Sequence, residues 1–284
     1  MNAAAGWAWA DGQVMPLAEA TVPLSDPGFL LGDGVFETLR ARHGKIFAWP
    51  RHRERMAHGL DVLGIEPTVL ARVDSALVAL TEAAASTFDD MYVRVQVVRA
   101  PGAGMTTGTV TALARACPDY PAHWYEQGVR LGVTELRCDP EAPLAGVKSL
   151  SYLPQVLARR HAQTRGFDDA LMLNTMGRVC ESAHGNIIAR LGRTLYAPGR
   201  EEGALGGVTR GALLRWADEH DYIIEIRLPW EVLSEVEEAV LVSTLAGVVP
   251  VASVEGIDTH LVAGSGELAI AMRQAYEDLL NGLQ

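Results

Sequence analysis

Residues 32–40 read GDGVFETLR, in which two glycines bracket an aspartate and a run of mixed apolar and polar residues follows. Glycines spaced in this way predict a turn at 32–34, and the residues that follow predict a strand over 35–41. Residues 43–44, a histidine and a glycine, predict a hairpin turn into a second strand at 45–48. The segment therefore predicts a β-hairpin that begins directly after a tight turn.

Two helices are expected after this hairpin. Pro50 suits the first turn of a helix, and Met56, Leu60 and Leu63 recur after it at helical spacing. Pro67 opens a second helix that runs to about residue 85. Alternating apolar residues predict further strands at 6–10, 13–17, 91–98 and 109–114.

The composition changes near Pro118 and Pro121, because two prolines in four residues disfavour regular structure. We expect an interdomain linker over 118–127, a small N-terminal α/β domain over 1–117 and a larger C-terminal domain over 128–284. Strands and helices alternate in the second half, which indicates a mixed α/β (α+β) protein of two domains. The expected strands are 131–136, 170–173, 178–181, 223–227 and 239–243, and the expected helices are 153–164, 208–219 and 267–280.

The composition excludes several classes of protein. Of the 284 residues, 49% are hydrophobic, which is too many for a disordered chain. The net charge of -11 argues against a general nucleic-acid binder, which needs a basic face to replace the counterions on phosphates. An acidic surface still permits a local basic pocket for one small anion.

The sequence favours a soluble, cytoplasmic protein without membrane partners. Three scattered cysteines fit reduced thiols better than a disulfide framework, and we expect neither a signal peptide nor a membrane span. The eight histidines show no metal-ligand spacing, so no metal site is expected. The chain also lacks a P-loop lysine, a G-x-S-x-G elbow and a well-placed G-x-G-x-x-G motif.

Lysine is rare in this chain, which carries only Lys45 and Lys148. Lys45 is most simply a solvated turn residue. Lys148 lies among apolar neighbours just before an expected helix, where a surface lysine is the commoner case. The alternative is a partly desolvated amine with a lowered pKa, which is suited to forming a Schiff base with a carbonyl. Composition alone favours the surface lysine.

Five blocks of sequence, in their order along residues 24–256, resemble the fold-type-IV pyridoxal-phosphate enzymes, the class IV aminotransferases. In that family a small and a large domain hold the cofactor between them, so the resemblance implies this architecture here. The blocks are GDGVFETLR at 32–40 with Phe47 and HRERM at 52–56, the segment around Lys148, DALMLN at 169–174 with GRVCES at 177–182 and Asn186-Ile187, GGVTR at 206–210, and VSTLAGVVPV at 242–251.

The resemblance implies that pyridoxal 5′-phosphate is the cofactor and that Lys148, in the C-terminal domain, is the catalytic residue. Lys148 would bind the cofactor as a Schiff base and shuttle the substrate proton. Glu181 would face the pyridine nitrogen and keep it protonated. The implied cofactor-binding residues are Arg55, Lys148, Tyr152, Glu181, Val208, Thr209, Ser243 and Thr244.

Each of these residues also has a simpler interpretation. Glu181 would be a solvated residue at a strand end, and Arg55 part of a solvated helix face. Thr209 would be an ordinary N-cap, Ser243 and Thr244 a turn, and Tyr152 a half-buried core residue.

On the substrate side, Tyr92 and Arg94 stand two apart in a strand and so point to the same face. They resemble the pair that lines the substrate side of branched-chain aminotransferases, and an arginine there suits a carboxylate. The resemblance also places Phe36, Thr38, Leu245 and Ala246 on the substrate side.

We therefore expect an aminotransferase that moves an amino group between a small hydrophobic amino acid and a 2-oxo acid such as 2-oxoglutarate. The resemblance implies a homodimer with shared active sites. A D-amino acid or (R)-amine transaminase is a further alternative, although D-amino acid transaminases match less well, because the Arg and His of their carboxylate trap are here Gly104 and Thr106. The serious alternative is a 4-amino-4-deoxychorismate lyase, which releases pyruvate. A non-enzymatic α/β binding protein is disfavoured, because Lys148 and Glu181 are both present.

Overall fold

The computed structural model describes residues 5–100, 106–258, 261–262, 264 and 266–282. They form two compact units, which we describe separately. The first unit contains the described residues up to Pro118 together with Val147–Tyr152 and Gly282. The second contains the described residues of Asp119–Gly146 and Leu153–Asn281. Lys148, which we expected in the C-terminal domain, thus belongs to the first unit.

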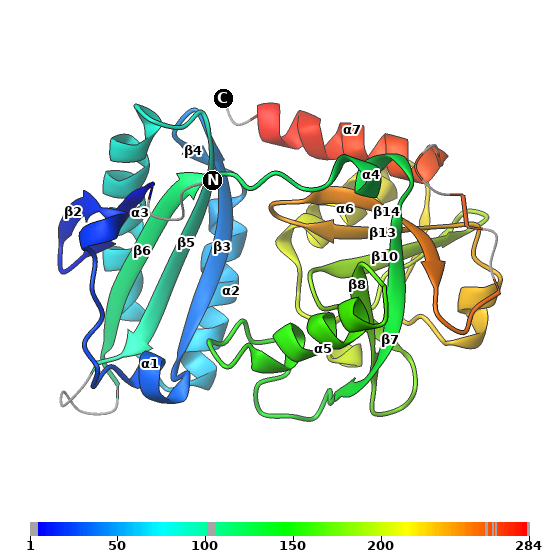
Figure 1. Ribbon diagram of the computed structural model, residues 1–284, viewed down its shortest axis with the longest axis horizontal. Helices are drawn as coiled ribbons and strands as arrows, with labels where there is room; N and C mark the ends of the chain where they lie inside the picture. Colours follow the sequence, from blue (N-terminus) through cyan, green and yellow to red (C-terminus); the bar gives the residue numbers. More distant parts are fainter. Residues whose placement is uncertain (1–4, 101–105, 259–260, 263, 265, 283–284) are drawn as a thin grey trace. The chain divides into compact units, whose positions relative to one another are not determined.

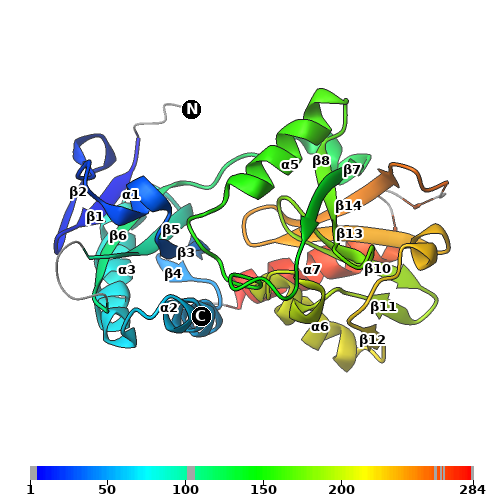
Figure 2. The ribbon, with the colours of Figure 1, turned by 90° about the horizontal axis from the view of Figure 1, so that it is seen from below.

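The first unit contains a six-stranded antiparallel sheet in the order β2-β1-β6-β5-β3-β4 (Figure 1). Two helices, α2 (Trp49–Val62) and α3 (Leu70–Ala85), cover one face of it, and the short helix α1 (Pro27–Leu31) precedes β3 (Figure 2). The strands are β1 (Trp7–Ala10), β2 (Gln13–Pro16), β3 (Gly34–Arg42), β4 (Lys45–Ile46), β5 (Asp90–Arg99) and β6 (Gly108–Ala116), and the 3₁₀ turns are Leu17–Glu19 and Pro67–Val69.

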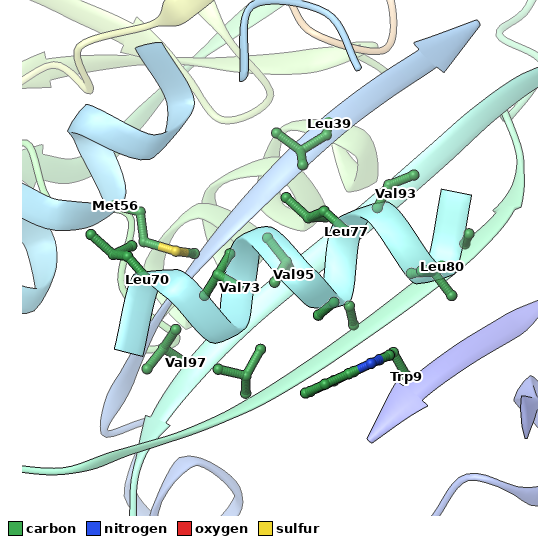
Figure 3. Packing of buried hydrophobic residues seen from close by; sticks show 14 of the residues in the cluster. Trp9, Leu39, Met56, Leu70, Val73, Leu77, Leu80, Val93, Val95 and Val97 are labelled. Carbon is green, nitrogen blue, oxygen red and sulfur yellow. The ribbon is translucent and has the colours of Figure 1, made fainter. Parts of the chain in front are cut away.

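The core of this unit lies between the sheet and these helices. Val93, Val95 and Val97 alternate along β5 and pack against Val73 and Leu77 of α3 (Figure 3). Each such side chain contributes about 1.5–3 kcal/mol when it is fully buried. The period-two pattern therefore directs one face of β5 to the helices and leaves Tyr92, Arg94 and Gln96 on the opposite face.

The second unit contains an eight-stranded mixed sheet in the order β12-β11-β10-β13-β14-β7-β8-β9. The pairs β11–β12, β14–β7 and β7–β8 are parallel, and the other neighbours are antiparallel. The strands are β7 (Val129–Cys138), β8 (Asp169–Asn174), β9 (Val179–Ser182), β10 (Asn186–Leu191), β11 (Thr194–Tyr196), β12 (Ile223–Glu225), β13 (Glu238–Ser243) and β14 (Gly247–Val254). The helices are α4 (Ala122–Glu126), α5 (Leu153–Thr164), α6 (Val208–Glu219) and α7 (Glu267–Asn281), with 3₁₀ turns at Arg200–Glu202 and Glu231–Ser234.

Parts of the chain differ from the secondary structure expected from the sequence. Residues 122–126, expected as linker, form helix α4, because Trp124 is buried and packs with the core of the second unit. The strands β10, β11 and β14 were not expected, because the turns that join β10 to β11 and β13 to β14 in antiparallel hairpins were not recognised in the sequence. Pro250 lies within β14, where it pairs with Val240 although proline has no N–H to donate to the ladder.

No helix within the described ranges has the length and apolar character needed to cross a membrane.

Candidate active site

The segment that carries Lys148 is held against the edge of strand β3. The N–H of Phe36 donates to the carbonyl of Lys148 at 2.9 Å, and the N–H of Leu150 donates to the carbonyl of Gly34 at 2.9 Å. Val35 and Ser149 form the antiparallel bridge between these two bonds. The backbone of Lys148 is therefore fixed by the same hydrogen-bond pattern that joins neighbouring strands.

The two glycines of the GDG turn make room for this segment. A Cβ atom on Gly34 would lie 2.8 Å from Leu150 Cδ1, and one on Gly32 would lie 2.7 Å from Ser151 Oγ. Gly32 also has a φ of 69°, which side chains other than glycine rarely adopt. Because they lack a Cβ atom, the two glycines allow the predicted turn to pack closely against the segment that carries Lys148.

The amine of Lys148 lies beside two aromatic rings. Its Nζ is 4.6 Å from the centroid of Phe36 and 5.4 Å from that of Tyr152. The two rings meet edge to face, with their centroids 5.4 Å apart. The side chain is half-buried, so Lys148 differs from the solvated surface lysine that composition alone favoured.

The four predicted substrate residues of the first unit share the sheet face opposite the helices. Thr38 pairs with Arg94 across β3 and β5. Phe36 and Tyr92 each lie two residues before one of this pair in the same strand, so their side chains are on the same face. The guanidinium of Arg94 stacks on Phe36, with Cζ 3.8 Å from the ring centroid. In the described ranges no carboxylate lies within ion-pair distance of Arg94, although its Nε donates to Gln96 Oε1 at 3.4 Å.

Arg55 is not on a solvated face of its helix. Its Nε donates to Glu37 Oε1 at 2.8 Å, and its Nη2 donates to Glu37 Oε2 at 2.6 Å. Burial acts to raise the pKa of Glu37, but the charge and hydrogen bonds of Arg55 outweigh it and lower the pKa to about 2. Arg55 is therefore a fixed cation, held by an ionised carboxylate.

In the second unit, Glu181 on β9 is held by two neighbours. Its Oε2 accepts the backbone N–H of Leu205 at 2.9 Å and the side-chain amide of Asn186 at 3.4 Å. Asn186 also donates to the carbonyl of Leu205 at 2.9 Å. The Glu181 side chain is buried, so it is not the solvated strand-end residue of the simpler interpretation.

Helix α6 begins beside this pair and has no side-chain cap. Its N-cap is Gly207, so Thr209 lies in the first turn and is not the N-cap. Thr209 Oγ1 is buried and has no hydrogen-bond partner in the described part of the chain. A Cβ atom on Gly207 would lie 1.8 Å from Asn186 Oδ1, so only glycine allows the helix to start here. An uncapped helix start with an unpaired hydroxyl is suited to binding an anion.

The turn between β13 and β14 contains the remaining predicted residues. The N–H of Ala246 donates to Ser243 Oγ at 3.3 Å, which closes the turn around Thr244 and Leu245. The hydroxyl of Tyr276 donates to the carbonyl of Thr244. That of Tyr125 donates to the carbonyl of Ala246 at 2.9 Å. Two tyrosines from separate helices thus hold the backbone of this turn.

A mostly apolar pocket in the second unit reaches this turn. Asp169 and His184 are the titratable residues in its wall. The lining residues are Trp124, Val129, Asp169, His184, Gly185, Leu241, Ser243, Ala246 and Val249.

These groups fit the chemistry of pyridoxal 5′-phosphate. The amine of Lys148 suits an aldehyde, and the carboxylate of Glu181 suits a protonated ring nitrogen. The unpaired hydroxyl of Thr209 at an uncapped helix start suits a phosphate ester.

Three residues that contact the predicted site residues Arg55 and Glu181 were not predicted from the sequence. Glu37 and His52 are buried beside Arg55, and Asn186 binds Glu181. Glu37 did carry a signal, because it interrupts the apolar face that Val35 and Leu39 form on β3. The expectation for Gly104 concerns a residue outside those that the structure describes.

Known proteins resemble this chain over most of its length. The model of the family described as amino-transferase class IV matches residues 34–254. An aminodeoxychorismate lyase from Vibrio harveyi is 27% identical over 92% of this chain and 96% of the lyase. A putative branched-chain-amino-acid aminotransferase from Methanocaldococcus jannaschii is 30% identical over 95% of this chain and 94% of that protein.

A solved structure, a hypothetical aminotransferase from Mycobacterium tuberculosis with alpha-ketoglutarate and PMP bound, is similar with a TM-score of 0.87. It is 22% identical and covers 98% of this chain and 100% of that chain. This likeness confirms the expected fold class.

Proposed function

Because this chain belongs to the class IV aminotransferases, whose cofactor is pyridoxal 5′-phosphate, we propose that it transfers an amino group between a small hydrophobic amino acid and a 2-oxo acid such as 2-oxoglutarate. The observation that carries this proposal is the half-buried amine of Lys148 beside Phe36, the ring on which Arg94 stacks. Enzymes of this family act on amino acids and keto acids, so an amine base close to a carboxylate-binding cation fits their substrates.

Lys148 Nζ is the group that accepts the proton leaving the substrate Cα. When bound, the cofactor supplies an electron sink that makes this proton acidic enough to remove. The rings of Phe36 and Tyr152 limit where Nζ can go, and the hydrogen bonds to β3 fix its backbone. Both constraints favour one approach of the base to the substrate.

Glu181 is the partner of the pyridine nitrogen, and a second set of residues binds the phosphate. The hydrogen bonds from Leu205 and Asn186 keep the carboxylate of Glu181 in one orientation. The proposed phosphate-binding residues are Arg55, Val208, Thr209, Ser243 and Thr244, and Tyr152 is proposed to contact the cofactor as well.

Arg94 is the proposed site of the substrate carboxylate. Of the other arginines on its sheet face, Arg40 and Arg42 are both paired with Asp90, with nitrogen–oxygen distances of 2.6 and 3.3 Å, and Arg115 lies over the ring of Tyr92. A guanidinium without a carboxylate partner among the described residues, such as that of Arg94 beside Phe36, suits a substrate carboxylate.

The experiment that tests the proposal is a panel of L- and D-amino acids and one primary amine, each incubated with the purified protein and 2-oxoglutarate. We expect glutamate to form with small aliphatic donors. Lys148→Ala should abolish this activity and the visible absorption of the bound cofactor. Lys45→Ala changes the other lysine of the chain and should leave both unchanged.

A pyruvate-releasing lyase is the second candidate, because a lyase is among the similar proteins. Its chorismate-type substrate and 2-oxoglutarate both carry two carboxylates, so the guanidinium of Arg94 does not distinguish the two reactions and the assay decides between them. Release of pyruvate from aminodeoxychorismate, with no glutamate formed on the panel, would replace our proposal with this one.

We also propose that the protein is a homodimer. Four large apolar side chains are exposed in and just before α1, with exposed fractions of 81% for Leu24, 66% for Phe29, 60% for Leu30 and 75% for Leu31. Large apolar side chains exposed within one short segment are typical of interfaces. Light scattering coupled to size exclusion should give twice the mass of the chain, and a monomer at all concentrations would reject this part of the proposal.

A further inference from the structure

Three polar side chains are buried between β3 and α2. Glu37 and His52 are both 0% exposed, and the side chain of Arg55 is 9% exposed. The neighbours of Glu37 on the same strand face, Val35 and Leu39, belong to the hydrophobic core. A charge buried in such surroundings costs several kcal/mol unless it is paired and hydrogen-bonded.

The pairing between Glu37 and Arg55 uses two parallel hydrogen bonds. Nε reaches Oε1 at 2.8 Å and Nη2 reaches Oε2 at 2.6 Å, so the plane of the guanidinium is fixed against the plane of the carboxylate. The pairing with Glu37 uses the edge formed by Nε and Nη2, and the N–H groups of Nη1 lie outside that edge. A bidentate contact therefore sets the direction in which the second edge points.

His52 contacts the same carboxylate oxygen as Arg55 Nη2, and its Nδ1 is 3.4 Å from that Nη2 atom. Its Nδ1 lies 2.8 Å from Glu37 Oε2, and since the carboxylate accepts, Nδ1 carries the proton. Burial lowers the pKa of His52, so the ring is neutral and adds no second positive charge. Its Nε2 has no hydrogen-bond partner in the part of the chain that the structure describes. His52 thus orients Glu37 as a neutral donor and leaves the negative charge of the carboxylate to pair with Arg55.

We propose that Glu37 and His52 are positioning residues for the cofactor phosphate, because they hold the guanidinium of Arg55 in the one orientation that presents its outer edge to the phosphate. This inference rests on the proposed phosphate contact of Arg55. A core ion pair with no such role would stabilise the fold alone, and its loss would weaken every ligand alike. The two roles therefore differ in whether the loss of Glu37 or His52 weakens binding of the phosphorylated ligand more than binding of the same ligand without the phosphate.

The test compares two ligands that differ only in the phosphate. The full-length protein, stripped of cofactor, is titrated with pyridoxal 5′-phosphate and with pyridoxal, and the ratio of the two dissociation constants is measured by absorption. We expect Glu37→Gln to reduce the preference for the phosphorylated ligand by about tenfold or more, which corresponds to the loss of a charge-assisted hydrogen bond. Glu54→Gln, on the same helix and paired with exposed Arg51 at 2.9 Å, is the matched control and should leave the ratio unchanged.

A second pair of variants decides the matter if Glu37→Gln does not fold. His52→Leu removes the donor to Glu37 and should lower the ratio, while His52→Asn keeps an uncharged donor and should restore most of it. An unchanged ratio in His52→Leu, or equal weakening of both ligands, overturns the inference.

Arg55→Ala separates the inference from the function on which it rests. If Arg55→Ala leaves the ratio unchanged, Arg55 does not bind the phosphate, and both the proposed contact and this inference fail. If Arg55→Ala lowers the ratio while Glu37→Gln does not, only the inference is overturned. We expect both to lower it, with no further loss when Glu37→Gln is added to Arg55→Ala.

Discussion

Gly34 and Leu150 are packed so closely that a Cβ atom on the glycine would lie 2.8 Å from Leu150 Cδ1. On its other side the same Cβ would lie 2.5 Å from the carbonyl oxygen of Val97, which is backbone and cannot move away. The hydrogen bond from Leu150 to the carbonyl of Gly34 ties the two residues together. The GDG turn at residues 32–34 therefore packs directly against the segment that carries Lys148.

Gly34→Ala should accordingly displace this segment. We expect a loss of about 1–3 kcal/mol in the free energy of unfolding, as for an overpacked core, together with weaker binding of the cofactor. Urea denaturation and a cofactor titration measure the two effects. Gly211→Ala is the control: its Cβ would meet only Arg215 Nη1 at 3.9 Å, and alanine in helix α6 should be neutral or slightly stabilising.

Thr209→Val should stabilise the cofactor-free protein and weaken its binding of the cofactor. Thr209 Oγ1 is buried without a partner among the described residues, so replacing it with a methyl group removes an unpaired polar atom. We expect the cofactor-free protein to gain up to about 1–2 kcal/mol in the free energy of unfolding, while its affinity for pyridoxal 5′-phosphate falls.

The control for Thr209→Val is Thr81→Val, which removes a buried hydroxyl that does have a partner. Thr81 Oγ1 donates to the carbonyl of Leu77 at 2.8 Å, so this variant should lose stability and keep its cofactor affinity. If Thr209→Val destabilises the cofactor-free protein as Thr81→Val does, the hydroxyl of Thr209 has a partner and is not reserved for a ligand.

Tyr125→Phe should loosen the turn between β13 and β14. The variant removes the donor to the carbonyl of Ala246, and the net cost of one such hydrogen bond is about 1 kcal/mol. Because Ala246 is a proposed substrate residue, we expect a higher KM for the amino donor with a smaller change in kcat. Steady-state kinetics measure both, and a change in kcat alone would contradict the proposed place of the turn.

Local signals in the sequence predicted much of the fold. The boundaries expected for α5 and α6 agree with Leu153–Thr164 and Val208–Glu219, because apolar spacing and nearby turn residues define helices from their own segments. Strand β10 was not predicted. Its hairpin with β11, through the turn at 192–193, is local and was overlooked, whereas its pairing with β13, more than forty residues further along the chain, leaves no local pattern.

The residues of the candidate site could likewise be predicted from the sequence only in part. Lys148 was singled out as one of two lysines and Glu181 by its place in the family pattern, so both were predicted without a structure. The partnership of Glu37 with His52 and Arg55 was not, because it depends on which face of α2 meets which face of β3. Periodicity places His52 and Arg55 on one side of a helix, but it does not identify the acid that faces them.

Asp169 should make the stability of the protein fall as the pH rises. Burial raises the pKa of Asp169 from its ordinary value of 3.8 to about 6, although the N–H of Ala170 and the charge of Arg159 act against this. Its Oδ2 has no hydrogen-bond partner within the described ranges, so the ionised form is poorly solvated. A group whose pKa is raised by folding binds its proton more tightly in the folded state.

The stability contributed by the protonated carboxyl is therefore complete below pH 3.8 and is lost as the pH rises through about 6. Asp169→Asn stays neutral throughout this range. Its free energy of unfolding relative to the unmodified protein should thus increase between these two pH values by an amount on the order of 3 kcal/mol. Urea denaturation of both proteins on either side of the window measures this difference. Two curves that run parallel across it would mean that Asp169 ionises as easily in the folded chain as in the unfolded one.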